Sequence, residues 1–268
     1  VTLVEAEVLG GASQLRDCLP SKALVASVTG LAGIRASGHL GAGDPGRFRP
    51  DVARLAERRL SVASLLSESI RGRLESLGVE LRRGRARFTG PRSLVVTGDG
   101  REEILEFDAA LVATGSVPRV PAWAEPDGAR VLTSRQAYRL GEAPEHVVVV
   151  GAGPTGAEFA HIFQCLGSQV TLFASRGRVL PQADPEAAAA LQDEFAERGV
   201  ALWRGARAQA VRLRDTGVEV VAEDGRTAAV SHVVLAVGLR PAVAGLGLEA
   251  AGLPTSEVGI PVDAEQRS

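Results

Sequence analysis

The chain has 268 residues and a formal net charge of −2, and 45% of its residues are hydrophobic. This length is enough for two domains with separate cores. There is no basic excess of the kind that nucleic-acid binding requires, and no apolar run reaches the length of a membrane span. Two cysteines are too few for a disulfide scaffold, and the start shows no signal peptide, so we expect a cytoplasmic protein. The sequence contains no methionine, which indicates a fragment or a processed product.

The first part of the chain alternates an apolar strand with helices. Val1–Glu5 (VTLVE) reads as a strand that ends in an acid, and Gly10–Lys22 leads into a helix expected at Ser21–Leu31. A loop rich in Gly and Pro follows at Gly41–Pro50. Apolar spacing over Asp51–Leu77 predicts a long amphipathic helix with its first residue as the N-cap.

Strand-like segments come next, at Val79–Phe88, Ser93–Thr97 and Ile104–Ala113, with a turn at Thr97-Gly98-Asp99-Gly100. They predict a small antiparallel meander that returns to the sheet through a buried strand at Ala109–Ala113. Pro118–Pro144 is then the connection into a second domain.

The stretch His146–Ala160 (HVVVVGAGPTGAEFA) predicts a dinucleotide site. Its four consecutive valines are typical of a strand buried on both faces. Gly151 permits a tight turn, Gly153 lets the backbone approach a pyrophosphate, and Gly156 lets helix and strand pack closely. The alternative is a glycine-rich surface turn. The helix up to Gly167 and the strand after it favour the functional interpretation.

The second domain continues with a helix at Asp184–Arg198, which Asp184 caps, Pro185 begins and Gly199 ends. The expected strands are Ala201–Arg204, Ala208–Arg214, Gly217–Ala222 and His232–Ala236. Gly259–Asp263 begins an element that the chain does not complete.

An internal repeat relates the two halves. Ala113–Pro118 and Ala236–Pro241 both read A-x-G-x-x-P after a buried strand, and Val1–Glu5 (VTLVE) resembles Val170–Ala174 (VTLFA). Counting back from Val1–Glu5 places a first strand and phosphate loop before the start of the chain. We therefore expect an α/β protein with two Rossmann-like domains and an antiparallel β-meander, truncated at both ends. The expected ranges are an incomplete dinucleotide-binding domain at 1–140, a second dinucleotide-binding domain at 141–256, and a return toward the first domain at 257–268.

Gly10–Lys22 (GGASQLRDCLPSK) resembles the flavin-side segment of the pyridine nucleotide–disulfide oxidoreductases. In that family two glycines precede two cysteines separated by four residues, followed by an apolar residue and Pro-Ser-Lys. Here Cys18 matches the second cysteine, and Ser13 replaces the first. The two A-x-G-x-x-P loops and the inserted glycine loop also fall in family order, so the resemblance implies an FAD-binding domain at 1–140, an NAD(P)H-binding domain at 141–256 and the start of a return to the FAD domain at 257–268. Members that lack the first cysteine, the actinobacterial NAD(P)H:quinone reductases, are the most similar.

The resemblance implies roles for individual residues. Glu5 would bind the adenosine ribose of FAD, and Ala86 would meet the adenine through its backbone. Cys18 would face the flavin, with an inert thiol as the alternative. Lys22, the only lysine among 30 basic residues, would lie beside the flavin N5 and pair with Glu158. For Glu158 the alternative is a glutamate favoured by the helix dipole. Further expected cofactor-binding residues are Gly10, Gly11, Ala113, Thr114, Gly115, Pro154, Thr155, Ala208 and Gly238.

The replacement at Ser13 bears on the reaction class, because dithiol–disulfide exchange requires a second thiol. The resemblance then implies hydride transfer from NAD(P)H to FAD and onward to a small, quinone-like acceptor, in a full-length homodimer. Two alternatives stay open: a dihydrolipoamide dehydrogenase-type disulfide reductase, and a non-catalytic dinucleotide-binding fragment. The four histidines match no catalytic position of the family, and no metal site is expected.

The strand before position 175 bears on the choice of nicotinamide cofactor. NAD-selective members of this fold carry an acid at the end of this strand, whereas Ala174 stands here and Ser175, Arg176 and Arg178 follow. An arginine can bind a 2′-phosphate, so the sequence favours NADPH. The alternative is that these arginines are ordinary solvated residues of a turn.

Overall fold

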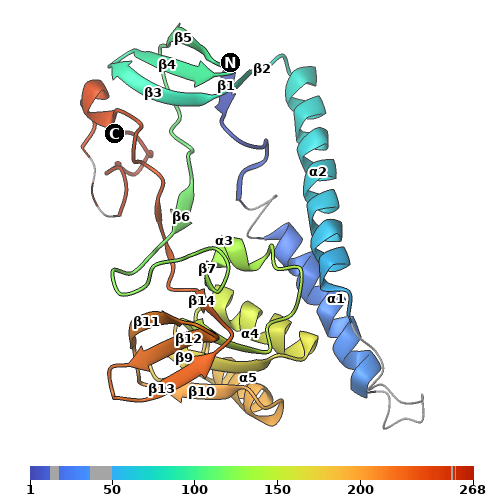
Figure 1. Ribbon diagram of the computed structural model, residues 1–268. Coiled ribbons are helices and arrows are strands. Elements are labelled where there is room, and N and C mark those ends of the chain that lie inside the picture. The colour runs from blue at the N-terminus through green and yellow to red at the C-terminus, as the bar shows by residue number, and fades with distance from the viewer. Residues whose placement is uncertain (13–17, 37–49, 255, 257) are drawn as a thin grey trace. The chain divides into compact units, whose positions relative to one another are not determined.

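The computed structural model describes residues 1–12, 18–36, 50–254, 256 and 258–268 (Figure 1). Ser13, and the loop Gly41–Pro50 before its last residue, lie outside the described residues. The chain divides into two compact units, which are considered separately below. Unit 1 comprises Val1–Leu19, Ser61–Val117 and Leu239–Ser268, and unit 2 comprises Pro20–Leu60 and Pro118–Gly238.

A five-stranded parallel sheet forms the centre of unit 2. Its strands in spatial order are β10 (Ala201–Arg204), β9 (Gln169–Ala174), β8 (His146–Val150), β14 (His232–Leu235) and β7 (Val131–Thr133). The valines of β8 are each at most 4% exposed, because the middle of a parallel sheet is covered on both faces. The sequence-based prediction of a buried parallel strand is therefore confirmed.

Alternate valines of β8 face different layers. Val147 and Val149 belong to the core that the helices cover, whereas Val148 and Val150 belong to a second core on the opposite face. The helices with residues in the first core or packed against it include α1 (Leu19–Ala36), α2 (Val52–Ser76), α3 (Ser134–Ala137), α4 (Pro154–Leu166) and α5 (Pro185–Glu197). The second core is covered by the antiparallel strands β11 (Ala208–Arg214), β12 (Gly217–Ala222) and β13 (Thr227–Val230).

Local signals set the helix ends in unit 2. Gly167 adopts the left-handed conformation (φ 98°) directly after α4, where a glycine avoids the strain that a Cβ would cause. The Asp184 carboxylate accepts hydrogen bonds from the backbone N–H groups of Glu186 (2.9 Å) and Ala187 (3.2 Å) at the start of α5. Both helix boundaries agree with the expectations from the sequence.

Unit 1 contains a short parallel pair and an antiparallel meander. β1 (Thr2–Glu5) pairs with β2 (Glu80–Arg83), and the pairing brings Glu5 opposite Arg83. The meander consists of β3 (Arg85–Gly90), β4 (Ser93–Gly98) and β5 (Arg101–Glu106). A 3-10 turn, η4 (Leu248–Ala251), contacts β3. In unit 2, the Asp51 carboxylate caps the start of α2 by accepting from the N–H of Arg54 at 2.9 Å, as expected.

The two A-x-G-x-x-P repeats pair with one another. β6 (Ser116–Pro118) and β15 (Leu239–Pro241) form a two-stranded sheet. The Gly115 carbonyl accepts from the N–H of Ala242, and the Gly238 carbonyl accepts from the N–H of Arg119, both at 2.9 Å. Gly115 and Gly238 share the left-handed conformation, with φ of 70° and 99°. The equivalent positions of the repeat therefore have equivalent backbone conformations.

One expected strand is absent. β5 ends at Glu106, and the residues 109–113, which the sequence predicted as a buried strand, form no strand and leave Leu111 93% exposed. The prediction was wrong because a parallel strand needs a hydrogen-bonded neighbour, and among the described residues the β1–β2 pair extends no further. Four strands were not expected. β6 and β15 form within the two repeat segments, β7 forms within the proline-rich connection, and β13 adds a third strand to the β11–β12 pair.

The compact units cut the chain differently from the expected ranges. Residues 20–60 and 118–140 pack with the parallel sheet in unit 2, whereas 239–256 belong to unit 1. The cause lies in α1: Val28 is fully buried in the same core as α4, so the helix after Cys18 joins unit 2. The assignment of FAD and NAD(P)H to the expected ranges stays a prediction.

Candidate functional site

The glycine loop after β8 has the backbone that a phosphate-binding turn requires. Gly151 has a φ of 110°, and a Cβ there would collide with the Ala236 carbonyl at the end of β14. A Cβ on Gly156 would collide with the Gly151 carbonyl, so the glycine sets how closely α4 approaches the loop. Gly153 differs, because a Cβ there would meet nothing within 4 Å. The space over Gly153 is open, as the approach of a pyrophosphate requires.

The first turn of α4 is free to bind an anion. Gly153 is the N-cap residue and offers no side-chain cap, and Pro154 follows at the first helical position, where it has no N–H to satisfy. The N–H groups of the next residues, Thr155 and Gly156, precede the first intrahelical bond. Together with the positive end of the helix dipole, these donors suit a dinucleotide phosphate.

Two arginines that follow β9, Arg176 and Arg178, are candidates for binding the 2′-phosphate of NADPH, and their side chains differ in their contacts. The guanidinium of Arg178 donates to the Pro181 carbonyl at 2.7 Å, so it holds the loop in place. Arg176 is exposed and forms no side-chain hydrogen bond within the described part of the chain. Ala174 is buried, and its partner in the sheet register is Arg204 of β10, a residue that the sequence analysis did not select. Parallel register, invisible before the strands are placed, brings Arg204 to this edge.

Lys22 and Glu158 form an ion pair within unit 2, with the Nζ of Lys22 on the Oε1 of Glu158. The pair joins the first turn of α1 to α4, 136 residues further along the chain. The Lys22 side chain is 55% exposed and that of Glu158 is 23% exposed. The structure therefore contains the pair that the family resemblance implied, and its open side is able to face a ligand. A role in catalysis stays a prediction.

A second polar contact also joins α1 to α4, one or two helical turns away from the ion pair. The Nε2 of His161 lies 2.9 Å from the Oγ1 of Thr29, and the His161 ring also contacts the Cys165 thiol at 3.7 Å. Burial, with a smaller effect of the Arg198 charge, lowers the pKa of His161. A neutral imidazole then serves as a hydrogen-bonding partner between α1 and α4. Thr29 follows Lys22 by two helical turns, and His161 follows Glu158 by one, so this contact helps to set the geometry of the ion pair.

The expected flavin-side residues lie in unit 1. Glu5 ends β1 at the carboxyl edge of the parallel pair, where ligands of such sheets bind, and its Oε1 accepts from the N–H of Glu7 at 2.8 Å. Gly10 and Gly11 both have positive φ, of 118° and 66°. Cys18 is exposed and directly precedes α1. Nothing in these positions conflicts with a dinucleotide at this edge.

The other residues expected to bind a cofactor differ in their solvent exposure. Ala113 and Thr114 are exposed, and Ala86 is half-buried in β3. Ala208 is buried in the core beneath β11 and β12, so only its backbone could meet a ligand. In the residues that the structure describes, no three His, Cys, Asp or Glu side chains form a group that could hold a metal ion. None of the described helices has the length and apolar character needed to cross a membrane.

The whole chain matches one known protein family. A family profile described as "Pyridine nucleotide-disulphide oxidoreductase" matches residues 1–268. The chain belongs to this family. Its members use FAD and NAD(P)H, and the open glycine loop and uncapped helix of unit 2 fit the nicotinamide dinucleotide.

Individual relatives narrow the comparison. The chain is 40% identical to a protein of Mycobacterium tuberculosis (strain H37Rv) named "NAD(P)H dehydrogenase (quinone)", over 94% of this chain and 53% of that protein. It is 35% identical to a "Dihydrolipoyl dehydrogenase" of Chlorobaculum tepidum, over 99% of this chain and 58% of the relative. The chain therefore spans little more than half the length of these relatives.

Solved structures agree with the family assignment. The crystal structure of LpdA from M. tuberculosis matches with a TM-score of 0.89 and 39% identity, covering 98% of this chain and 58% of that one. The HOCl-induced flavoprotein disulfide reductase RclA from Escherichia coli, as its Cu(II) complex, matches with a TM-score of 0.83 and 25% identity, covering 98% and 56%. The expected fold, a truncated pair of Rossmann-like domains with a β-meander, is confirmed.

Proposed function

We propose that the full-length protein is a flavoprotein oxidoreductase that takes hydride from NAD(P)H and reduces a small quinone-like acceptor. The observation that carries the proposal is the Lys22–Glu158 ion pair, which joins α1 to α4, the helix that follows the dinucleotide loop. FAD, when bound, supplies the chemistry of accepting a hydride and releasing electrons to the acceptor. The name of the M. tuberculosis relative, "NAD(P)H dehydrogenase (quinone)", supports this acceptor class.

The cysteines of this chain argue against dithiol chemistry. Exchange with a disulfide substrate proceeds through a mixed disulfide that a second thiol resolves. The chain has two cysteines: Cys18, which is exposed, and Cys165, which is 1% exposed inside the core of unit 2. Ser13 stands where the family places the first redox cysteine. Cys18 is therefore expected to act as a neighbour of the flavin rather than as a redox thiol.

Lys22 has a defined task in this proposal. Its ammonium is held by the Glu158 carboxylate, which in turn is fixed on α4. An ammonium oriented in advance in this way would stabilise negative charge on a bound, reduced flavin without reorganising during the reaction. Because 55% of the Lys22 side chain is exposed, the pair offers this charge to a ligand rather than burying it.

NADPH is the proposed nicotinamide cofactor. Ala174 places no carboxylate at the end of β9, so the repulsion that an acid exerts on a 2′-phosphate is absent. Arg176 lies exposed directly after that strand and is available for charge-assisted bonds, whereas Arg178 is held by Pro181. We also propose that the full-length protein is a cytoplasmic homodimer. For location this rests on the low cysteine count, and for assembly on the family resemblance.

The acceptor is tested with FAD-loaded protein and NADPH, measuring reduction of a benzoquinone and of lipoamide. We expect quinone reduction in the wild type and little change in Cys18→Ser, because no thiol takes part in the reaction. Ser13→Cys serves as the matched variant: it supplies a second thiol without changing the ion pair. Lipoamide reduction by the wild type that Cys18→Ser abolishes would establish the disulfide reductase instead. Absence of any NADPH oxidation by FAD-loaded protein would favour the non-catalytic fragment.

A further inference from the structure

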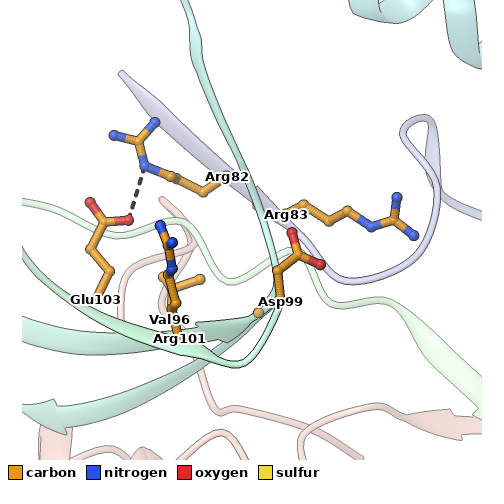
Figure 2. Close-up of a pocket in the computed structure, with 7 residues that line it drawn as sticks. Arg82, Arg83, Val96, Asp99, Arg101 and Glu103 are labelled. Atoms are coloured by element: carbon orange, nitrogen blue, oxygen red, sulfur yellow. Dashed lines mark hydrogen bonds and ion pairs between the residues drawn. The ribbon is translucent and has the colours of Figure 1, made fainter.

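Unit 1 contains a hollow of about 350 Å³ that none of the assigned roles uses (Figure 2). A volume of this size lies at the lower end of the range found for small-molecule sites. The residues that line it are Arg82, Arg83, Val96, Gly98, Asp99, Arg101 and Glu103. They come from the end of β2 and from the β4–β5 hairpin, two segments of the same unit.

The backbone fixes the shape of this hollow. A Cβ on Gly98 would collide with the carbonyl of Arg83, so the hairpin lies directly against the end of β2. Asp99 and Gly100 have φ of 50° and 74°, the conformation of a tight two-residue turn. Val96 is buried and supplies an apolar wall. The site is therefore built from paired strands and a turn rather than from a long loop.

Arginine side chains dominate the charge of the hollow. Arg82 is committed to carboxylates, since its Nε donates to Glu103 at 3.1 Å and its Nη2 donates to Glu80 at 2.5 Å. Arg83 and Arg101 form no ion pair with any residue that the structure describes. Figure 2 shows the guanidinium of Arg101 extending toward Arg82, while Arg83 extends past Asp99. Once Arg82 and Glu103 neutralise each other, Arg83, Arg101 and Asp99 leave the lining with a net charge of one positive unit.

We propose that this hollow binds a small phosphate-bearing molecule, held by Arg83 and Arg101. A guanidinium presents a planar fork of donors that matches two phosphate oxygens, and two forks suit a tetrahedral group better than a planar carboxylate. The attraction is local, because the chain as a whole carries a net charge of −2. The residues of the hollow belong to unit 1, whereas the glycine loop Gly151–Gly156 belongs to unit 2, so the two sites share no residue.

The experiment is a calorimetric titration of the purified chain with inorganic pyrophosphate at low salt. We expect a saturable site whose affinity is at least about tenfold lower in Arg83→Ala and in Arg101→Ala, since each variant loses a charge-assisted fork. Arg87→Ala is the matched control. It removes the same charge from an exposed arginine of β3 whose register partner is Val95, on the opposite face of the meander from Val96, and it should bind like the wild type.

Three results would overturn the proposal. The first is the absence of saturable pyrophosphate binding, and the second is equal weakening in Arg87→Ala, which would indicate general surface attraction. The third is competitive displacement by FAD: Glu5, the expected ribose ligand, pairs with Arg83 in the β1–β2 register, so competition would make the hollow part of the flavin site. Saturable binding that persists with excess FAD and requires Arg83 and Arg101 would confirm it. Circular dichroism of each variant checks that these exposed substitutions leave the fold intact.

Discussion

At the scale of single residues, the Lys22–Glu158 pair is expected to affect the reaction rate and the stability of the fold to different degrees. Both side chains are partly exposed, and ion pairs of this kind contribute only about 0–1 kcal/mol to folding. An ammonium beside a reacting ring, in contrast, contributes through charge that develops during the reaction. The pair is thus expected to matter much more for rate than for the fold.

Lys22→Met should therefore slow reduction of the bound flavin by NADPH roughly 100-fold, the usual effect of losing one such charged donor, with almost no change in melting temperature. Glu158→Gln should give a smaller loss, because the ammonium remains but is held less firmly. Anaerobic stopped-flow absorbance at the flavin band measures both. A rate in Lys22→Met within twofold of the wild type would show that the pair only joins the helices.

Arg176 belongs to the same scale. Arg176→Ala should lower kcat/KM for NADPH by roughly tenfold or more and leave that for NADH nearly unchanged, because only NADPH carries the 2′-phosphate. The matched control is Arg212→Ala, on the exposed part of β11, which should change neither value. Wild-type preference for NADH, or an unchanged NADPH value in Arg176→Ala, would assign the specificity elsewhere, with Arg204 as the next residue to test.

At the scale of elements, β8 and α4 are held at a distance that Gly156 sets. Gly156→Ala places a Cβ where the Gly151 carbonyl lies, and that carbonyl is backbone and cannot rotate away. We expect a destabilisation of about 1–3 kcal/mol, the usual cost of overpacking, measured by denaturant unfolding. Gly153→Ala is the control and should cost less, since its Cβ meets nothing within 4 Å and only the weaker N-cap preference of alanine is lost. Equal stability of the two variants would refute this account of the loop.

The elements also show what the sequence could predict. Runs such as the four valines of β8 and caps such as Asp184 carry strong local signals, so these elements were placed correctly. β7 has three residues in a proline-rich stretch and forms because β14 offers a free edge, which local sequence does not reveal. Residues 109–113 show the reverse: their apolar pattern is strand-like, but no partner strand is at hand.

The candidate site follows the same division. The glycine positions and the Lys22–Glu158 pair were recognisable from motifs, the second only through the family resemblance. The Thr29–His161 contact, Arg204 beside Ala174, and the hollow between Arg83 and Arg101 depend on register and packing between distant segments. Residue order alone does not contain that information.

At the scale of the whole molecule, the histidines couple stability to pH. Burial lowers the pKa of His146, His161 and His232 below the ordinary value of 6.5, with nearby arginine charges adding to the effect at the last two. The unfolded chain then binds more protons than the folded protein as pH falls below about 6.5, so the folded state loses stability on acidification. Above that pH the contribution is fully present.

We expect the denaturant concentration at the unfolding midpoint to decrease as the pH is lowered from about 7.5 to about 5.5. The decrease should be smaller in His161→Gln, whose amide can keep a hydrogen bond to Thr29. Carboxylates with lowered pKa values, such as Glu219 beside Arg214, act below about pH 4.5 and stay outside this window. A midpoint that is constant or rises toward pH 5.5 would contradict the assignment of neutral, buried imidazoles.

The central claim is that the loop after β8 binds the nicotinamide dinucleotide, and Gly153 tests it most directly. Its φ of −74° suits any residue, and a Cβ there would meet nothing within 4 Å, but a side chain would occupy the space of the pyrophosphate. Gly153→Val should therefore stay folded, with only the small loss of stability that an apolar N-cap causes, and lose at least about tenfold in NADPH affinity by calorimetry. Gly141→Val, also open and in the same unit, should bind like the wild type. Unchanged NADPH affinity in Gly153→Val, or no binding by the wild type, would contradict the account.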